Sequence, residues 1–555
     1  MAADWGEAVA RAVVGAWRTL PKNGKPQPHE YTCLAAILSS RSVVESANTF
    51  LVNNLGPIAV FPGCPPLSST PPPPAPPPPQ IPCSDDDPAT LQVVSLGTGT
   101  KCIPGFKRCA VGTILHDGHA EVMCRRGLLY RLTAELSTLL SHHPHPHAGA
   151  HTDTHPSRPR ARYHLLVPTQ YDSTRCRLAP GVRLHLFVSQ PPCGDASIFS
   201  SWIDPDQYPT REGGVSSPSP SPLHAGRTTG AKVLLPTCTS PDSPVASRQP
   251  PLASDVEKGP PRLGATRRKP GRGEPTLSMS CSDKLLKWNG VGLQGALLES
   301  FLEQPLFLDS ITIAVVRPPG EKTGPPTDEG TDTPTHVPRD VDVHDLRTHI
   351  EVEKAVRRAV AERLDLTPPT VLILRPAYTP HPDPDHPHTP ISPVSPISSV
   401  PLVSTPYLIS PSPWPPEWQK TTPHRTSPCG SSLVWVGPVL RGEPLLHEAN
   451  SSTTGQRLGC TVRTPVPKAT SRVSRAAHTV RILHLLRLVE GHHAKPQVRW
   501  ESKSYRAFRA ALGPQYVAAW ADMRAQMPGA WLVKPEIEGE TTVGEMKEEV
   551  GVASE

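Results

Sequence analysis

The stretch of the chain best suited to chemistry is His119-Ala120-Glu121, where a metal-binding side chain stands two positions before a carboxylate. A His near a helix start is usually a surface or core residue, so the triplet alone is weak evidence. A second stretch, QPPCGDASIF (190–199), places Cys193 after an apolar run and two prolines, where a helix can begin. Backbone N–H groups at such a point stabilise a thiolate, the form of cysteine that binds metal.

A His together with a Cys thiolate selects zinc among the common metals, and a catalytic zinc needs three protein ligands and an open position for water. Zinc nucleobase deaminases combine His-x-Glu with Pro-Cys-x-x-Cys, and the Glu moves protons. Here the third residue after Cys193 is Ala196, so that pattern lacks its last ligand. The segment LSMSCSDKLLKWNGVGLQGALL (277–298) offers Cys281, after a Ser-rich turn and at the start of a predicted helix.

Proline sets the organisation of the chain, with 73 among its 555 residues. Runs of this composition cannot bury enough apolar surface to offset the ordering of the chain, so we expect them to be disordered. The remainder, roughly 350 residues, suffices for one large domain or two small ones. The expected disordered insertions lie at about 65–88, 141–160, 205–275, 317–342 and 375–428, and a disordered tail is expected at 541–555.

The charge balance, 56 Lys and Arg against 50 Asp and Glu, gives +6, which is compatible with a nucleic-acid partner without demonstrating one. The twelve Cys lack the regular spacing of a disulfide framework. Asp4 and Glu7 stand where a signal peptide would be positive, and no apolar run approaches the ~18 residues needed to cross a bilayer. We expect an intracellular protein of a reducing compartment, nucleus or cytoplasm, with neither a membrane nor a DNA partner.

Hydrophobic periodicity predicts strands that alternate with helices, which favours a mixed α/β core. A helical pattern is also read in EYTCLAAILSSR (30–41). The other predicted helices lie at about 5–19, 119–141, 283–302, 342–364, 469–489 and 504–527, and the predicted strands at 90–103, 162–169, 182–195, 306–316 and 431–436.

Four blocks follow one another along the chain: Gly-Thr-Gly-Thr-Lys-Cys (97–102), His-Ala-Glu, Pro-Cys-Gly-Asp and Ser-Cys-Ser-Asp-Lys. In this order they resemble the adenosine deaminase (editase) domain of the RNA-editing adenosine deaminases and of the tRNA-specific adenosine deaminase of position 37. The resemblance covers about residues 1–540 with the insertions excluded. It implies an α/β fold: a cytidine-deaminase-like mixed sheet flanked by helices, in a single catalytic domain.

The resemblance also implies roles for individual residues. His119, Cys193 and Cys281 match the zinc ligands, and Glu121 matches the proton shuttle between the zinc-bound water and the base as ammonia leaves. Zinc lowers the pKa of its water toward ~7, which provides a hydroxide nucleophile at neutral pH.

Substrate and cofactor positions follow from the same resemblance. Thr100 and Lys101 match positions that line the pocket near the target nucleotide and its phosphates. In this family a buried basic cluster holds inositol hexakisphosphate, and buried like charges do require a polyanion. The residues that match this cluster are Arg125, Arg126, Lys284, Lys287, Trp288, Lys468, Arg472, Arg475, Tyr505, Arg509, Tyr516, Trp531 and Lys534. His116 stands where family members carry an Asn.

Three features favour the tRNA branch. Residues 1–90 are too short and proline-rich for a double-stranded-RNA-binding domain, Ser197 stands where the duplex editases carry Arg, and QYVAAW…GAWLVKP resembles the tRNA enzyme. We expect hydrolytic deamination of adenosine to inosine at position 37 of an alanine tRNA. The alternatives are a duplex-RNA editase, an inactive RNA-binding relative, and a structural zinc protein, although a structural site would want four ligands.

Overall fold

A mixed sheet lies at the centre of the fold, and in the part of the chain that the structure describes it contains eight strands. Strands β6, β9, β10 and β11 are parallel, whereas β2, β3, β13 and β14 pair with their neighbours antiparallel. In spatial order the strands are β11 (Leu408–Ser410), β10 (Thr370–Pro376), β9 (Ser310–Ala314), β6 (Val182–Val188), β2 (Leu34–Arg41), β3 (Gln92–Thr98), β13 (Ser431–Val436) and β14 (Leu446–Ser451).

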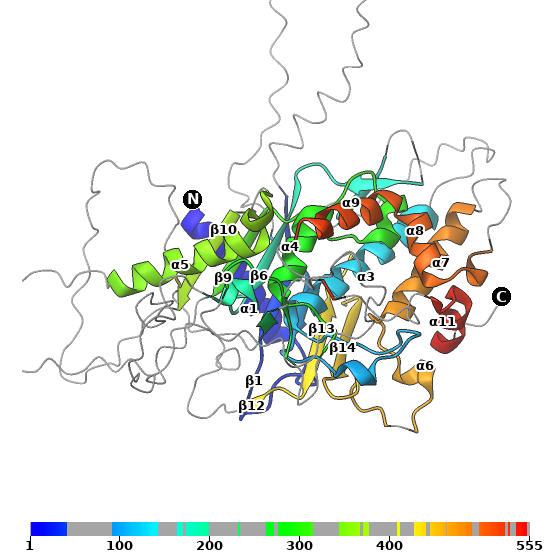
Figure 1. The fold of residues 1–555 in the computed structure, drawn as a ribbon, viewed down its shortest axis with the longest axis horizontal. Helices are drawn as coiled ribbons and strands as arrows, with labels where there is room; N and C mark the ends of the chain where they lie inside the picture. The colour runs from blue at the N-terminus through cyan, green and yellow to red at the C-terminus, as the bar shows by residue number, and fades with distance from the viewer. Residues whose placement is uncertain are drawn as a thin grey trace, which may run out of the picture.

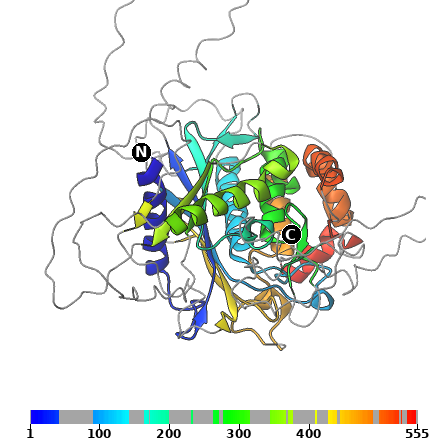
Figure 2. The ribbon, with the colours of Figure 1, turned by 60° about the vertical axis from the view of Figure 1, so that its left-hand side comes forward.

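Helices cover both faces of this sheet. The helices of the described residues are α1 (Ala2–Thr19), α3 (Ala120–Ser141), α4 (Cys281–Val291), α5 (Val343–Val360), α6 (Val466–Ala469), α7 (Arg475–Glu490), α8 (Tyr505–Leu512), α9 (Pro514–Ala525) and α11 (Val543–Val550), of which α1, α3 and α5 pack directly on strands of the sheet. Figure 1 shows α7, α8 and α11 at one end of the molecule and α5 toward the other, with α9 between them next to α4. In Figure 2, α1 is the blue helix on the left-hand side of the molecule, to the left of the green helix α5. The expected mixed sheet flanked by helices is confirmed.

The described residues of this computed structural model are 2–41, 91–141, 164–169, 172, 174–198, 231–233, 262–270, 276–314, 343–366, 370–376, 408–410, 427–439, 444–461, 463–490, 499–527, 531–532 and 540–551. Most residues of the expected insertions lie outside these ranges. Among the described helices, none combines the length and the apolar character needed to cross a membrane.

Strand β2 explains why its sequence suggested a helix. The two faces of the strand enter different cores: Leu34, Ala36 and Leu38 pack toward α1, and Ala35 and Ile37 toward α3. A strand buried on both faces is a continuous apolar run without alternation, so periodicity does not separate it from a buried helix. The prediction of a helix over 30–41 is therefore wrong.

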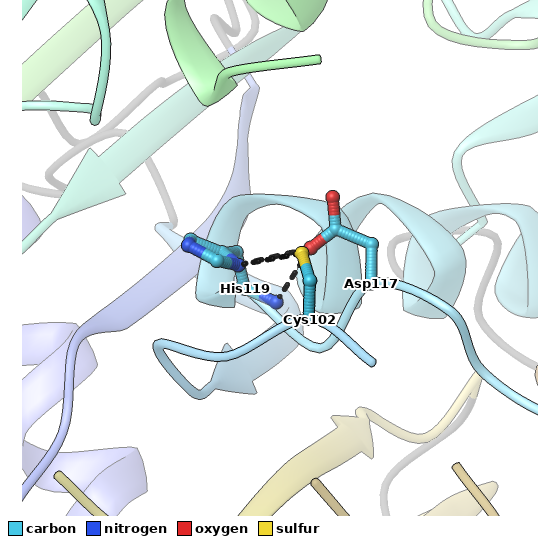
Figure 3. Close-up of side chains that lie close together, drawn as sticks. All are labelled: Cys102, Asp117 and His119. Atoms are coloured by element: carbon cyan, nitrogen blue, oxygen red, sulfur yellow. Dashed lines mark hydrogen bonds and ion pairs between the residues drawn. The ribbon is translucent and has the colours of Figure 1, made fainter. Parts of the chain in front are cut away.

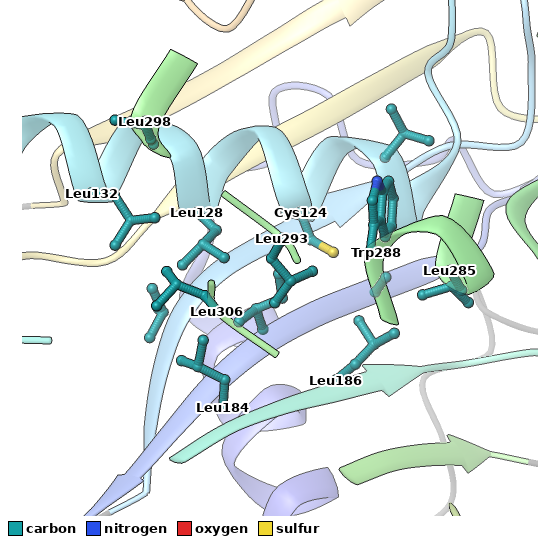
Figure 4. Close-up of a cluster of buried hydrophobic side chains, with 14 of the residues drawn as sticks. Cys124, Leu128, Leu132, Leu184, Leu186, Leu285, Trp288, Leu293, Leu298 and Leu306 are labelled. Carbon is teal, nitrogen blue, oxygen red and sulfur yellow. The ribbon is translucent and has the colours of Figure 1, made fainter. Parts of the chain in front are cut away.

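The larger core joins α3 and α4 to the sheet. Leu128 and Leu132 of α3, Trp288 of α4, and Leu184 and Leu186 of β6 meet in it, as Figure 4 shows. Each fully buried side chain of this size contributes about 1.5–3 kcal/mol to stability. This packing fixes the first turns of α3 and α4, where the candidate site residues lie.

Three two-stranded sheets accompany the large sheet in the described part of the chain. The sheets pair β1 (Glu30–Tyr31) with β12 (Ser427–Pro428), β4 (Leu166–Pro168) with β5 (Cys176–Leu178), and β7 (Lys232–Val233) with β8 (Arg267–Arg268). Strands β7 and β8 fall inside the expected insertion 205–275, and β11 and β12 inside 375–428, so these parts are structured. The expected disordered tail is wrong for α11, whose Val543 and Met546 are buried.

Candidate metal centre

The first turn of α3 carries two of the predicted site residues, His119 and Glu121. A close approach of β3 to this turn positions them, because the N–H of Ala120 donates to the carbonyl of Gly99 at 3.0 Å. Gly99 has φ +132°, and a Cβ there would lie 1.9 Å from the carbonyl oxygen of Gly118. Only glycine fits such a contact.

The turn after β6 brings Cys193 to the first residue of α4. The N–H of Cys281 lies 3.4 Å from Sγ of Cys193, and the N–H of Ser282 donates to the carbonyl of Cys193 at 3.0 Å. The predicted stabilisation of Cys193 by helix N–H groups is therefore seen, but the helix is α4, because only the 3-10 turn η3 (Asp195–Ser197) follows Cys193 directly. Cys193 and Cys281, which are 88 residues apart in the chain, therefore lie next to each other at the start of α4.

The ring of His119 is oriented by Asp117. Oδ1 of Asp117 lies 3.0 Å from Nδ1 of His119 and accepts the backbone N–H of His119 at the same distance. Figure 3 shows the second ring nitrogen pointing away from Asp117 and Cys102. A carboxylate on one nitrogen of a His commonly fixes the other nitrogen for a metal. The pKa of Cys193 is lowered by a hydrogen bond with Cys281 and, to a smaller extent, by one with His119, so the His119 ring lies close to Cys193.

Lys269 is a site residue that the sequence reasoning missed. It follows β8, within the expected insertion, and is fully buried. Its ammonium donates to Oδ2 of Asp117 at 2.8 Å and lies 3.1 Å from Sγ of Cys281. Lys284 also donates to Oδ2 of Asp117. A chain of charges therefore runs from Lys284 through Asp117 and Lys269 to Cys281.

The charges of this chain fix the protonation of its members. Burial alone would raise the pKa of Asp117, but the ammonium groups of Lys269 and Lys284 hold it well below its usual range. The pKa of Cys193 also lies well below its usual range, because of a hydrogen bond with Cys281 and the nearby Lys269 charge. A thiolate at Cys193 is the form that binds metal.

Glu121 is a buried carboxylate, 4% exposed. Burial, together with the charge of Cys193, raises its pKa. A raised pKa makes a carboxylate a stronger base, so it takes up a proton more readily and can pass it on. This is the property that a proton shuttle requires.

Two sets of side chains compete for a metal. Cys102, Asp117 and His119 have ligand atoms within 4.8 Å of one another. However, both oxygens of Asp117 already serve His119, Lys269 and Lys284, and two ammonium groups beside a carboxylate repel a cation. The donor set of the predicted ligands, one imidazole and two thiolates, suits zinc. His119, Cys193 and Cys281 therefore fit zinc better.

The predicted substrate residues lie beside this centre. Oγ1 of Thr100 is buried without a hydrogen-bond partner in the described structure. Nζ of Lys101 donates to the carbonyl of Pro428 at 2.6 Å, which ties the residue to β12. Both residues lie in the segment that connects β3 with α3.

A second group of predicted residues meets next to α3. Arg125 and Arg126 are partly buried, and the Nε atom of each is buried without a hydrogen-bond partner. Burial and the charges of Arg125 and Arg475 lower the pKa of Arg126 to about 10. Unpaired guanidinium nitrogens beside like charges mark a place for a negative ligand.

Aromatic rings surround these cations. Arg125 lies over Trp288 with 5.0 Å to the ring centroid, and Arg475 lies over Tyr505 at the same distance. Nζ of Lys287 lies 3.8 Å from the ring centroid of Trp520. The further members of this group are Arg509 over Tyr505, and Tyr516 and Trp531 near Lys287. Trp520 was absent from the predicted set.

Some predicted members of the basic cluster do not join it. Lys468 is exposed, and Arg472 is largely exposed and paired with Glu448 at 3.1 Å. Lys534 lies outside the described residues. His116 accepts the N–H of Cys109 on Nε2 at 3.1 Å, so its ring serves the loop after Cys102.

The family model of the adenosine-deaminase (editase) domain matches residues 95–319. A "tRNA-specific adenosine deaminase 1" of Drosophila melanogaster is 29% identical over 305 residues, which cover 55% of this chain and 53% of the relative. The human protein of the same name is 30% identical over 367 residues, covering 53% of this chain and 62% of the relative.

A "Double-stranded RNA-specific editase Adar" of Drosophila melanogaster is 30% identical over 225 residues, or 40% of this chain and 27% of the relative. The chain thus spans less than two thirds of the length of these relatives. All four sequence blocks that carry the resemblance lie within residues 95–319. Residues 95–319 of this chain are therefore similar to the adenosine-deaminase (editase) domain.

Proposed function

We propose that this chain is a zinc-dependent hydrolase that deaminates adenosine to inosine in RNA. The observation that carries the proposal is the buried carboxyl group of Glu121, two residues after His119, whose pKa is raised by burial and by the charge of Cys193. A structural metal site needs no such proton-moving group. The presence of the complete donor set also argues against an inactive relative.

The residues divide the chemistry among them. His119, Cys193 and Cys281 would hold zinc, which supplies an activated water at neutral pH when bound. Glu121 takes a proton from the attacking water and delivers it to the base as the amino group leaves. Asp117 keeps the ring of His119 in place, and Lys269 stabilises negative charge on the sulfur of Cys281.

The proposed substrate is tRNA, at position 37 beside the anticodon of an alanine tRNA. Relatives named tRNA-specific adenosine deaminase 1 support a tRNA substrate, as does Ser197 at a position where duplex editases carry Arg. Ser197 donates to the carbonyl of Pro192 at 2.8 Å, so in this chain it braces the turn before Cys193. A duplex-RNA substrate is the second candidate, since duplex editases match the same segment.

We also propose inositol hexakisphosphate as a structural ligand of the cluster around Arg125 and Arg126. Its six phosphates suit a cluster of cations centred on Arg125 and Arg126, whose Nε atoms are buried without a hydrogen-bond partner among the described residues. The residues proposed to hold it are Arg125, Arg126, Lys284, Lys287, Trp288, Arg475, Tyr505, Arg509, Tyr516 and Trp531, with Lys534 as an untested addition. Lys468 and Arg472 are left out because they lie on the surface.

Purified protein incubated separately with alanine tRNA and with a long RNA duplex tests the substrate. Inosine at position 37 of the tRNA is the expected product, and inosine only in the duplex would replace the tRNA assignment with the editase one. The Glu121→Gln variant should lose at least about 100-fold in rate while it keeps about one zinc per chain. Persistent activity in this variant would refute the assignment of Glu121 as the proton shuttle.

A further inference from the structure

Two segments beside the candidate metal centre carry cations and no carboxylate. Residues 103–116 contain Lys107 and Arg108, residues 452–472 contain Arg457, Arg463, Lys468 and Arg472, and neither segment contains an Asp or Glu. Across the whole chain the acidic residues nearly balance the basic ones, 50 against 56. Six cations without an acidic neighbour in sequence are therefore a local feature. These six residues are called the basic rim below.

The two segments lie against each other. The N–H of Leu115 donates to the carbonyl of Gly455 at 2.8 Å, and the N–H of Ser471 donates to the carbonyl of Thr113 at 3.4 Å. Figure 1 accordingly shows the short helical turn after β3 close to α6. The two segments that carry the six cations therefore lie side by side.

One buried carboxylate anchors part of the basic rim from below. Glu448, 4% exposed, pairs through Oε2 with Nε of Arg457 at 3.5 Å and of Arg472 at 3.1 Å. Glu448 is thus already shared between two guanidinium groups, and Nη1 of Arg457 also donates to the carbonyl of Lys468 at 3.3 Å. Lys107, Arg463 and Lys468 are exposed.

The basic rim is continuous with the predicted substrate residues. Residues 103–116 begin directly after Cys102, and Lys101 is tied to the carbonyl of Pro428. Two residues further on, the carbonyl of Gly430 accepts the N–H of Ser452, the first residue of the second segment. Phe106, 71% exposed, adds an aromatic face with Nζ of Lys107 at 5.8 Å from its ring centroid. An aromatic ring among cations suits an unpaired base and its phosphate.

We infer that the basic rim binds the phosphate backbone of the RNA whose adenosine enters the metal centre. This inference rests on the proposed function, because it assigns a contact surface to the same substrate. Exposed cations clustered beside the site raise the local concentration of a polyanion and contribute sequence-independent affinity.

The test is the affinity of the full chain for an alanine tRNA transcript, measured across a range of salt concentrations. The rim variant combines Lys107→Glu, Arg463→Glu and Lys468→Glu, three exposed residues that leave the Glu448 pairs intact. The control variant combines Lys503→Glu, Arg506→Glu and Arg524→Glu, three exposed cations around α8 and α9 with the same change in charge.

The rim variant should bind the transcript at least about tenfold more weakly at ~0.1 M salt. Its slope of log affinity against log salt should fall by about 2, since each lost phosphate contact removes about 0.7. The control variant should lose much less on both measures. Equal losses in the two variants would overturn the inference. RNA binding through the rim without inosine formation would instead refute the proposed function alone.

Discussion

The ammonium group of Lys269 lies 3.1 Å from Sγ of Cys281, and both side chains are fully buried. A buried cation beside a buried thiol favours the thiolate, which is the metal-binding form. Lys269 also holds Asp117, the partner of His119, at 2.8 Å. One side chain thus supports two of the three proposed ligands from behind.

Lys269→Met should reduce zinc affinity and deamination rate by about 10–100-fold, the range typical of groups that support metal ligands. Burial raises the pKa of Cys281, and Lys269 opposes that rise. Without the ammonium, zinc uptake should therefore require a higher pH. Zinc content measured over a pH series checks this, with Lys269→Arg as the charge-retaining control. Identical pH series for the Met variant and the wild type would contradict it.

The blocks proposed to carry catalysis could be located from sequence because each is short and local. His119-Ala120-Glu121 opens α3, and Cys281 opens α4, as expected. Lys269 could not be located this way. It lies in a polar, proline-rich stretch whose composition predicts disorder, and its role comes from tertiary contacts with Asp117 and Cys281.

The surface assignments show the same limit. The sequence does not reveal whether the side chain of a basic residue faces inward, so the resemblance predicts the same role for Lys468 and Arg475. The structure places Arg475 over Tyr505 beside the buried cluster and leaves Lys468 exposed. Likewise β2 was read as a helix, because burial on both of its faces removes the alternation that marks a strand.

Gly194→Ala should destabilise the protein by about 1–3 kcal/mol and lower its zinc content. Gly194 has φ +107°, and a Cβ there would lie 2.3 Å from Oγ of Ser280, so the Cys193 turn would move away from α4. Gly15→Ala is the matched control, because this helical position has nothing within 4 Å of an added Cβ. Alanine there should raise the free energy of unfolding by about 0.5–1 kcal/mol. Urea unfolding and zinc analysis measure both effects. A Gly194 variant as stable as the Gly15 variant would disprove the close contact.

Inositol hexakisphosphate should raise the melting temperature of protein stripped of anions. At a concentration 100 times its Kd, a ligand of the folded state adds about 2.7 kcal/mol. Arg126→Ala should remove most of this effect, because it deletes a cation whose pKa is already lowered to about 10 by burial and like charge. Lys468→Ala should leave the effect unchanged. Thermal unfolding of both variants with and without the ligand shows whether it binds at the buried cluster or at the surface. An equal change in melting temperature for the two variants would count against binding at the cluster.

His185 should make the fold sensitive to acid. The ring is buried between Oγ of Ser40 and Oγ of Ser310, each 2.8 Å away, and burial together with Arg183 lowers its pKa to about 4. In the unfolded chain a His titrates near 6.5. Above that pH neither state is protonated, so the full stability is present.

As the pH falls from about 6.5 to about 4, the unfolded state takes up a proton that the folded state refuses, and stability is lost. The loss should approach about 2–3 kcal/mol. His185→Gln cannot take up this proton but retains one donor and one acceptor for Ser40 and Ser310. The difference in unfolding free energy between the wild type and this variant, measured by urea unfolding at several pH values, should therefore shrink by that amount toward pH 4. A difference that stays constant from pH 7 to pH 4 would show that His185 does not titrate as its burial requires.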